Sequence, residues 1–98
     1  LKGVVIAYEP VWAIGTGVTA QKDQVQAAHA TVRQILADRF EENDSVPVLY
    51  GGSVKPDNAE ALIQVPGVNG FLIGGASLDA ASFTSIVNSV EQVQMRKL

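Results

Sequence analysis

The sequence predicts an α/β fold in which helices cover a parallel β-sheet. Three short apolar runs, residues 4–8, 46–50 and 70–73, are rich in β-branched or aromatic side chains and show no polar alternation. Strands of this kind are typical of parallel sheets covered on both faces. A helix-like segment follows each run, so the expected order is strand then helix, repeated along the chain through right-handed crossovers.

The first helix is expected from about Gln21 to Phe40. An apolar stripe at helical spacing supports it, formed by Val25, Ala28, Val32, Ile35, Leu36 and Phe40. The second helix is short, with Pro56 and Asp57 in its first turn and Pro66-Gly67 at its end.

The third helix is expected to begin after Asp79, a favourable N-cap residue. Its apolar face consists of Phe83, Ile86, Val87, Val90 and Val93.

Composition describes an ordinary globular domain and argues against several function classes. The chain has 98 residues, of which 47% are hydrophobic and 17% charged. A net charge of -3 without a basic cluster gives no reason to expect a nucleic-acid partner. Cysteine is absent, so neither disulfides nor thiolate metal sites are expected, and a reducing compartment is allowed. No apolar run approaches the roughly 18 residues of a membrane span, and no membrane partner is expected.

An open sheet of three parallel strands would leave both edge strands unpaired and one face uncovered. Eight βα units close into a barrel of about 250 residues. Three units are what remains when the first five are removed, and the sequence also lacks an initiator Met. We therefore expect residues 1–98 to form the C-terminal part of a single (β/α)8 barrel domain, as its sixth, seventh and eighth units.

Glu9 stands directly after the first apolar run, at the end of the strand where barrel enzymes keep their catalytic groups. A lone Glu at such a place is more often a solvated carboxylate. The segment that follows has a bulky apolar middle and permissive ends: Pro10, Val11, Trp12, Ala13, Ile14, Gly15, Thr16 and Gly17. It is longer than the usual βα loop of about 2–6 residues. We interpret this segment as a lid that excludes water from Glu9 and so makes it a better general base.

Glycine pairs follow the other two apolar runs, Gly51-Gly52 before Ser53 and then Gly74-Gly75. A single pair is usually only a tight turn. In a (β/α)8 barrel, however, the loops after the last two strands commonly hold phosphate. Glycine leaves its N–H open to close approach, and a helix start adds positive partial charge. We expect a phosphate site here that needs no Lys or Arg, with a hydroxyl from Ser53.

Together and in this order, the three motifs resemble the C-terminal part of the triosephosphate isomerase family over essentially all 98 residues. The resemblance implies a partial TIM barrel from a cytoplasmic, homodimeric enzyme of glycolysis and gluconeogenesis that uses no cofactor or metal. It implies that Glu9 moves a proton between C1 and C2 of dihydroxyacetone phosphate and glyceraldehyde 3-phosphate through an enediolate. A glutamate base under a closing loop is a well-known feature of this very family, so the resemblance carries that mechanism.

The resemblance also implies roles for the surrounding residues. Amides for the substrate phosphate would come from Gly15, Ser53, Gly74 and Gly75. Ile14 and Leu72 would press on the base when the lid closes.

Three aromatic or hydroxyl groups would control the lid. Tyr50 and Ser53 would hold it closed, through amides near Ala20 and Gly17. Tyr8 would contact Trp12 in the open form.

The sequence departs from the family pattern at Asn69 and in lacking several active-site residues. Asn69 stands where the family usually has Asp, paired with the arginine that matches Arg33, so we expect a hydrogen bond in place of an ion pair. The family's electrophilic His, active-site Lys and Asn, and the Glu that receives Trp12 in the closed lid have no counterpart in this sequence. His29 matches a non-catalytic helix position and is expected to be a surface or packing residue.

The chain thus brings a base, a lid and phosphate-binding loops but no electrophile. We expect the isolated chain to be inactive, and to regain activity only with the N-terminal part of the same barrel. The alternative is a non-catalytic folding or self-assembly module whose sheet edges pair with a second copy. Another sugar-phosphate barrel enzyme is a weaker alternative, because such enzymes do not generally share this lid after a Glu.

Overall fold

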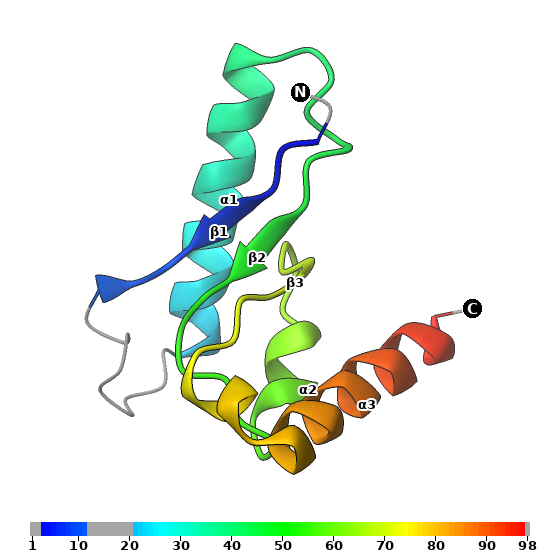
Figure 1. The fold of residues 1–98 in the computed structure, drawn as a ribbon. Helices are drawn as coiled ribbons and strands as arrows, with labels where there is room; N and C mark the ends of the chain where they lie inside the picture. Colours follow the sequence, from blue (N-terminus) through cyan, green and yellow to red (C-terminus); the bar gives the residue numbers. More distant parts are fainter. Residues whose placement is uncertain (1–2, 12–20, 98) are drawn as a thin grey trace.

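The computed structural model describes residues 3–11 and 21–97, in which strands and helices alternate along the chain (Figure 1). The elements are β1 (Ile6–Tyr8), α1 (Lys22–Arg39), β2 (Val48–Tyr50), α2 (Ala59–Ile63), β3 (Gly70–Phe71), the 3-10 helix η2 (Gly75–Leu78) and α3 (Ala80–Arg96). The expected α/β order is therefore confirmed.

The described strands form one parallel sheet in the order β1-β2-β3. Tyr8 lies opposite Tyr50, and Tyr50 lies opposite Phe71. Because the strands are parallel and in this register, their carboxyl ends meet at one edge of the sheet.

The strands are shorter than the apolar runs that predicted them. Val4 and Val5 precede β1 and are exposed, and β3 holds only two residues. Pairing nevertheless continues past the carboxyl ends, where Gly51 N–H donates to the Tyr8 carbonyl (2.8 Å) and Leu72 N–H donates to the Tyr50 carbonyl (3.0 Å). The hydrogen-bonded ladder thus reaches one residue beyond β2 and β3, into two of the loops that carry the predicted site.

Helix α1 buries a narrower face than its stripe predicted: Val25, His29 and Leu36 are its buried residues. Ile35 and Phe40 remain about half exposed. Each residue turns about 100° around a helix axis, which rotates Ile35 away from the direction of Leu36. Phe40 lies past the helix end in extended backbone.

Helix α2 begins three residues after Pro56, so Pro56 is not in its first turn as expected. The N–H groups of Asn58 and Ala59 both donate to the Lys55 carbonyl, at 3.1 and 3.0 Å. These bonds close a tight turn over residues 55–58, and the helix starts only after it.

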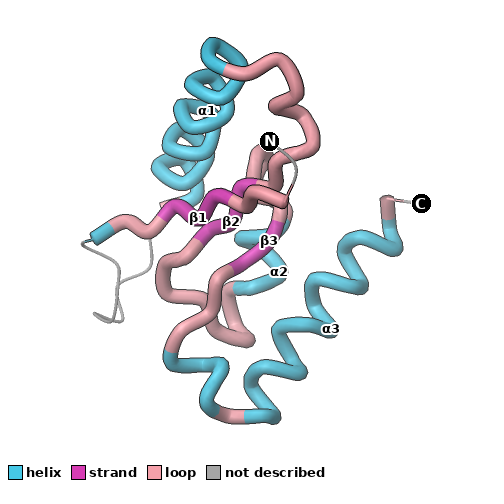
Figure 2. The backbone as a smooth tube through the Cα atoms, turned by 45° about the horizontal axis from the view of Figure 1, so that its top comes forward, coloured by secondary structure: helices cyan, strands magenta, loops and turns pink. Residues whose placement is uncertain are grey.

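Helix α3 begins where Asp79 predicted, because the Asp79 carboxylate accepts a hydrogen bond from the Ala81 N–H (3.0 Å). Ile86 and Val93 are buried, whereas Phe83 and Val87 of the same expected face stay partly exposed. α3 packs on α2, and its C-terminal end lies beyond β3, on the side of the sheet opposite β1 (Figure 2).

Arg33 connects α1 to the sheet. Its guanidinium donates to the carbonyls of Asn43 (2.8 Å) and Val46 (2.9 Å) and to Asn69 Oδ1 (3.1 Å). Asn69 Oδ1 also accepts from the Val48 N–H (2.8 Å). The hydrogen bond expected between Arg33 and Asn69 is therefore present. Among the described helices, none is long and apolar enough to cross a membrane.

Candidate active site

Three loops meet at the carboxyl edge of the sheet. Glu9, Gly51 and Leu72 directly follow the paired residues Tyr8, Tyr50 and Phe71. Ladder hydrogen bonds at Gly51 and Leu72 hold these three positions side by side.

A pocket of about 330 Å³ lies at this edge. Its lining comes from all three loops: Glu9, Gly51, Gly52, Ser53, Val54, Lys55, Leu72, Ile73, Gly74, Gly75 and Ala76. The structure therefore brings the predicted base Glu9 to the same pocket as Ser53, Leu72 and both glycine pairs. A carboxylate-bearing residue and two glycine-rich loops thus line one small pocket.

Glu9 lies across the backbone of Gly51. A Cβ atom added to Gly51 would stand 2.7 Å from Glu9 Cγ and 3.4 Å from the Tyr8 carbonyl oxygen. A contact under 3.0 Å requires one of the groups to shift, so any larger residue would displace the Glu9 side chain. Glycine at this position therefore leaves room for the side chain of Glu9, which is solvent-exposed.

Gly52 is also sterically required. A Cβ atom there would overlap the hydroxyl end of the Tyr50 ring. Tyr50 is fully buried and packs in the main core cluster with Val54, so its ring cannot easily give way. The loop after β2 thus packs closely against the core.

Gly74 and Gly75 differ from the first pair. Chain neighbours aside, a Cβ atom at either would meet no heavy atom of the described residues within 4 Å. Neither has a positive φ, since Gly3 and Gly67 are the glycines with that geometry in the described chain. Their missing side chains leave open space beside the start of η2, where a ligand could approach the backbone.

Lys55 also lines the pocket, although we expected a phosphate site without Lys or Arg. It is exposed and follows Ser53 by two residues. A cation beside Gly-rich loops favours an anion. Its position two residues after the Gly-Gly-Ser motif could have indicated Lys55 as a pocket residue, but we did not predict it.

Of the predicted lid, only Pro10 and Val11 belong to the described chain. Pro10 is buried, and Val11 is 84% exposed. Trp12, Ala13, Ile14, Gly15, Thr16 and Gly17 lie outside the described residues, as does Ala20. The lid, its phosphate contact and its latching by Tyr50 and Ser53 therefore stay predictions.

His29 is a packing residue beneath this edge. It is fully buried, and because a carbonyl only accepts, its Nδ1–H donates to the Gly67 carbonyl (3.1 Å). The ring stands edge-on to Tyr8 (centroids 5.8 Å apart) and 6.3 Å from Tyr50. Burial lowers the pKa of His29, and the charge of Arg33 lowers it further, against an opposing effect of the Gly67 hydrogen bond. The lowered pKa favours the neutral form of the ring.

Comparison with known proteins gives one consistent family. The family model for triosephosphate isomerase matches residues 1–90. A triosephosphate isomerase of Citrifermentans bemidjiense is 56% identical over 90 residues, which are 90% of this chain and 36% of that protein. One from Bdellovibrio bacteriovorus is 60% identical over 88 residues, or 89% of this chain and 35% of the relative.

A solved structure supports the same conclusion. The crystal structure of triosephosphate isomerase from Bartonella henselae superposes with a TM-score of 0.79 at 43% identity, covering 89% of this chain and 35% of that one. The chain thus spans little more than a third of the relatives that it matches, and it belongs to the triosephosphate isomerase family.

Proposed function

We propose that this chain supplies the catalytic base and the phosphate-binding loops of a triosephosphate isomerase, which interconverts dihydroxyacetone phosphate and D-glyceraldehyde 3-phosphate. One observation carries the proposal: the Glu9 carboxylate shares a pocket of about 330 Å³ with Ser53 and Gly74-Gly75. Family membership supports the choice of substrate.

In this mechanism, Glu9 takes a proton from one of two adjacent carbons of the triose and returns it to the other, while the hydroxyl proton passes from one substrate oxygen to the other through a group that this chain does not supply. The intermediate is an enediolate, in which negative charge develops on the substrate oxygens. The backbone N–H groups of Gly15, Ser53, Gly74 and Gly75 hold the phosphate, with Leu72 and Ile14 as apolar cover for the base. Lys55 adds a positive charge at the pocket.

We assign β1, β2 and β3 to the sixth, seventh and eighth strands of a (β/α)8 barrel, so that residues 1–98 form the C-terminal part of one barrel domain. The lid, residues 10–17, closes over Glu9 and is held by Tyr50 and Ser53. The parent enzyme is proposed to be a cytoplasmic homodimer.

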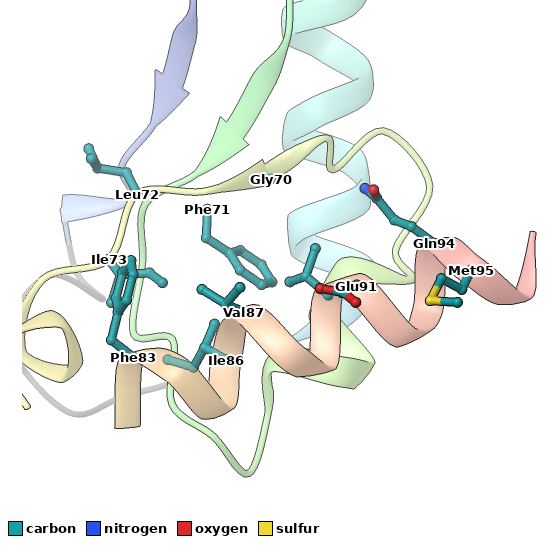
Figure 3. Close-up of a pocket in the computed structure, with 11 residues that line it drawn as sticks. Gly70, Phe71, Leu72, Ile73, Phe83, Ile86, Val87, Glu91, Gln94 and Met95 are labelled. Atoms are coloured by element: carbon teal, nitrogen blue, oxygen red, sulfur yellow. The ribbon is translucent and has the colours of Figure 1, made fainter. Parts of the chain in front are cut away.

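The remainder of the barrel is proposed to cover the open side of β3. There, an apolar groove of about 840 Å³ runs between β3 and α3. Phe71 points from β3 toward α3, and Ile86 and Val87 reach back from the helix (Figure 3). β3 pairs only with β2 within the described sheet, so its other edge can accept a further strand.

A chimera tests the proposal directly. The matching segment of the Bdellovibrio bacteriovorus relative is replaced by this chain, and isomerase turnover is measured beside that of the isolated 98-residue chain. We expect activity in the chimera, its loss on Glu9→Ala, and none in the isolated chain. An active chimera that keeps its rate after Glu9→Ala would refute the role of Glu9. Turnover by the isolated chain that Glu9→Ala abolishes would refute its dependence on the rest of the barrel.

The same groove favours a second candidate, a non-catalytic module that self-associates through its sheet edges. Leu72, Val87 and Met95 line the groove with side chains that are about half exposed or more. Size-exclusion chromatography of the isolated chain separates the cases. A discrete dimer of the isolated chain, together with a chimera that shows no turnover, favours the module. Dissociation of that dimer when the N-terminal barrel segment is added favours the isomerase.

A further inference from the structure

We propose that Asn58 is a positioning residue that fixes the backbone of the loop 51–55, and so prepares it to bind phosphate. The inference rests on the proposed function of that loop. Asn58 is half-buried and follows the loop by three residues. It does not line the candidate pocket, so it would act through the loop and not on the ligand.

The Asn58 side chain holds the loop at two points. Its Oδ1 accepts a hydrogen bond from the Lys55 N–H at 2.7 Å, and its Nδ2 donates to the Ser53 carbonyl at 3.0 Å. Both ends of one amide group are thus bound to the backbone on either side of Val54. We call this pair of hydrogen bonds the Asn58 clamp.

A forward cap on α2 does not account for this arrangement, although the bond to the Lys55 N–H runs backward as one bond of a capping box does. Asn58 occupies the N-cap position of α2, where an asparagine oxygen commonly accepts from an N–H of the first helical turn. Here the side chain makes no such cap hydrogen bond. Its groups face backward along the chain instead, toward residues 53 and 55.

The clamp fixes two successive peptide planes. In a trans peptide the C=O and the N–H point in opposite directions, and no cis bond occurs in the described chain. Directing the Ser53 carbonyl at Asn58 therefore turns the Val54 N–H away from it. The Lys55 N–H is directed at Asn58 as well, so the Val54 carbonyl also points away.

The other end of the loop has its own anchor. Gly51 N–H donates to the Tyr8 carbonyl at 2.8 Å, next to Glu9. Gly52 and Ser53 therefore lie between two fixed points, the sheet on one side and the clamp on the other. The side chain of Val54 is buried and adds a third attachment.

This fixation matters because the loop is irregular and begins with two glycines. Such backbone loses much conformational entropy when it is ordered. If the loop were free, that loss would be subtracted from the binding of phosphate. A loop ordered in advance avoids it, which is the general advantage of preorganisation.

The test compares Asn58→Ala with the matched control Asn88→Ala, in the full 98-residue chain. Asn88 is exposed on α3 and does not line the candidate pocket. Inorganic phosphate is titrated while amide signals of Ser53, Gly74 and Gly75 are followed by NMR. Without phosphate, hydrogen exchange is measured at the Lys55 and Ile86 amides.

We expect Asn58→Ala to weaken phosphate binding about tenfold, because the loop without its two hydrogen bonds must be ordered when phosphate binds. Exchange at Lys55 should accelerate while exchange at Ile86, in the core of α3, stays the same. Asn58→Asp keeps the acceptor for Lys55, so it should retain protection of that amide. The control should change none of these readouts.

Three results would overturn the proposal. Phosphate affinity unchanged by Asn58→Ala would do so, even if Lys55 lost protection. Equal acceleration at Lys55 and Ile86 would make Asn58 a residue of global stability. Unchanged exchange at Lys55 would show that no clamp exists. If the unmodified chain binds no phosphate, the idea that the loop is prepared for phosphate in this chain fails, while the chimera still tests the proposed function, and exchange at Lys55 still decides whether Asn58 holds the loop.

Discussion

Asn69→Asp should stabilise the chain through Arg33. Asn69 Oδ1 accepts from both the Arg33 guanidinium (3.1 Å) and the Val48 N–H (2.8 Å). A carboxylate would accept the same two bonds with a negative charge. The Arg33 bond is already charge-assisted on the donor side, so the substitution adds the attraction of an ion pair to it and a charged acceptor to the Val48 bond.

The gain must be reduced because Asn69 is exposed, and solvent screens an exposed ion pair. We therefore expect the free energy of unfolding to rise by about 0.5–1 kcal/mol at pH 7. The pairing favours the ionised acid in the folded chain. Its contribution is consequently present above the ordinary Asp pKa of about 3.9 and is lost as the pH falls below it.

Urea unfolding followed by circular dichroism measures the gain, in a cycle with Arg33→Met. The stabilisation by Asn69→Asp should shrink to a few tenths of a kcal/mol or less when Arg33→Met is also present, because only the Val48 bond then remains. An equal gain with and without Arg33 would refute the reasoning, as would no gain at all.

Three further perturbations test other parts of the structure. Gly51→Ala places a Cβ atom 2.7 Å from Glu9 Cγ. Because this displaces the base, it should lower the turnover of the chimera at least about tenfold. An unchanged rate would contradict the assigned geometry. The pKa of His29 is lowered in the folded chain, chiefly by burial, so unfolded chains bind the proton more readily and stability should fall as the pH drops below about 6.5. Urea midpoints at pH 7.5 and 5.5 should show less of this loss in His29→Gln, and equal losses would count against the buried ring. Ile86→Ala should cost about 2–5 kcal/mol of unfolding free energy, and Val87→Ala much less, because only Ile86 is fully buried; similar costs would mean that the groove is closed in solution.

Much of the fold follows from local patterns in the sequence. Short apolar runs predicted the parallel strands, and Asp79 predicted the start of α3 by a capping bond that the structure contains. The exposure of Phe83 and Val87 could not be predicted in the same way. A stripe shows which face of a helix is apolar, but only the neighbouring elements decide whether that face is covered.

The site was predictable as far as topology determines it. Parallel strands bring their carboxyl ends together, so Glu9 and the residues after β2 and β3 had to share an edge. Lys55 and Asn58 were missed for a different reason. The clamp depends on a side chain that turns back toward the preceding loop, whereas the cap bond expected of the residue just before a helix points forward.

The two glycine pairs look alike in the sequence, yet the structure gives them opposite physical reasons. Gly51 and Gly52 are required by their own protein neighbours, the Glu9 side chain and the Tyr50 ring. Around Gly74 and Gly75, in contrast, a Cβ atom would meet nothing in the described chain, and no positive φ excludes a side chain there. Internal packing therefore explains the first pair but not the second. The proposed phosphate, held close to the backbone at the start of η2, would explain the second pair, because it needs bare N–H groups and the room that a side chain would occupy.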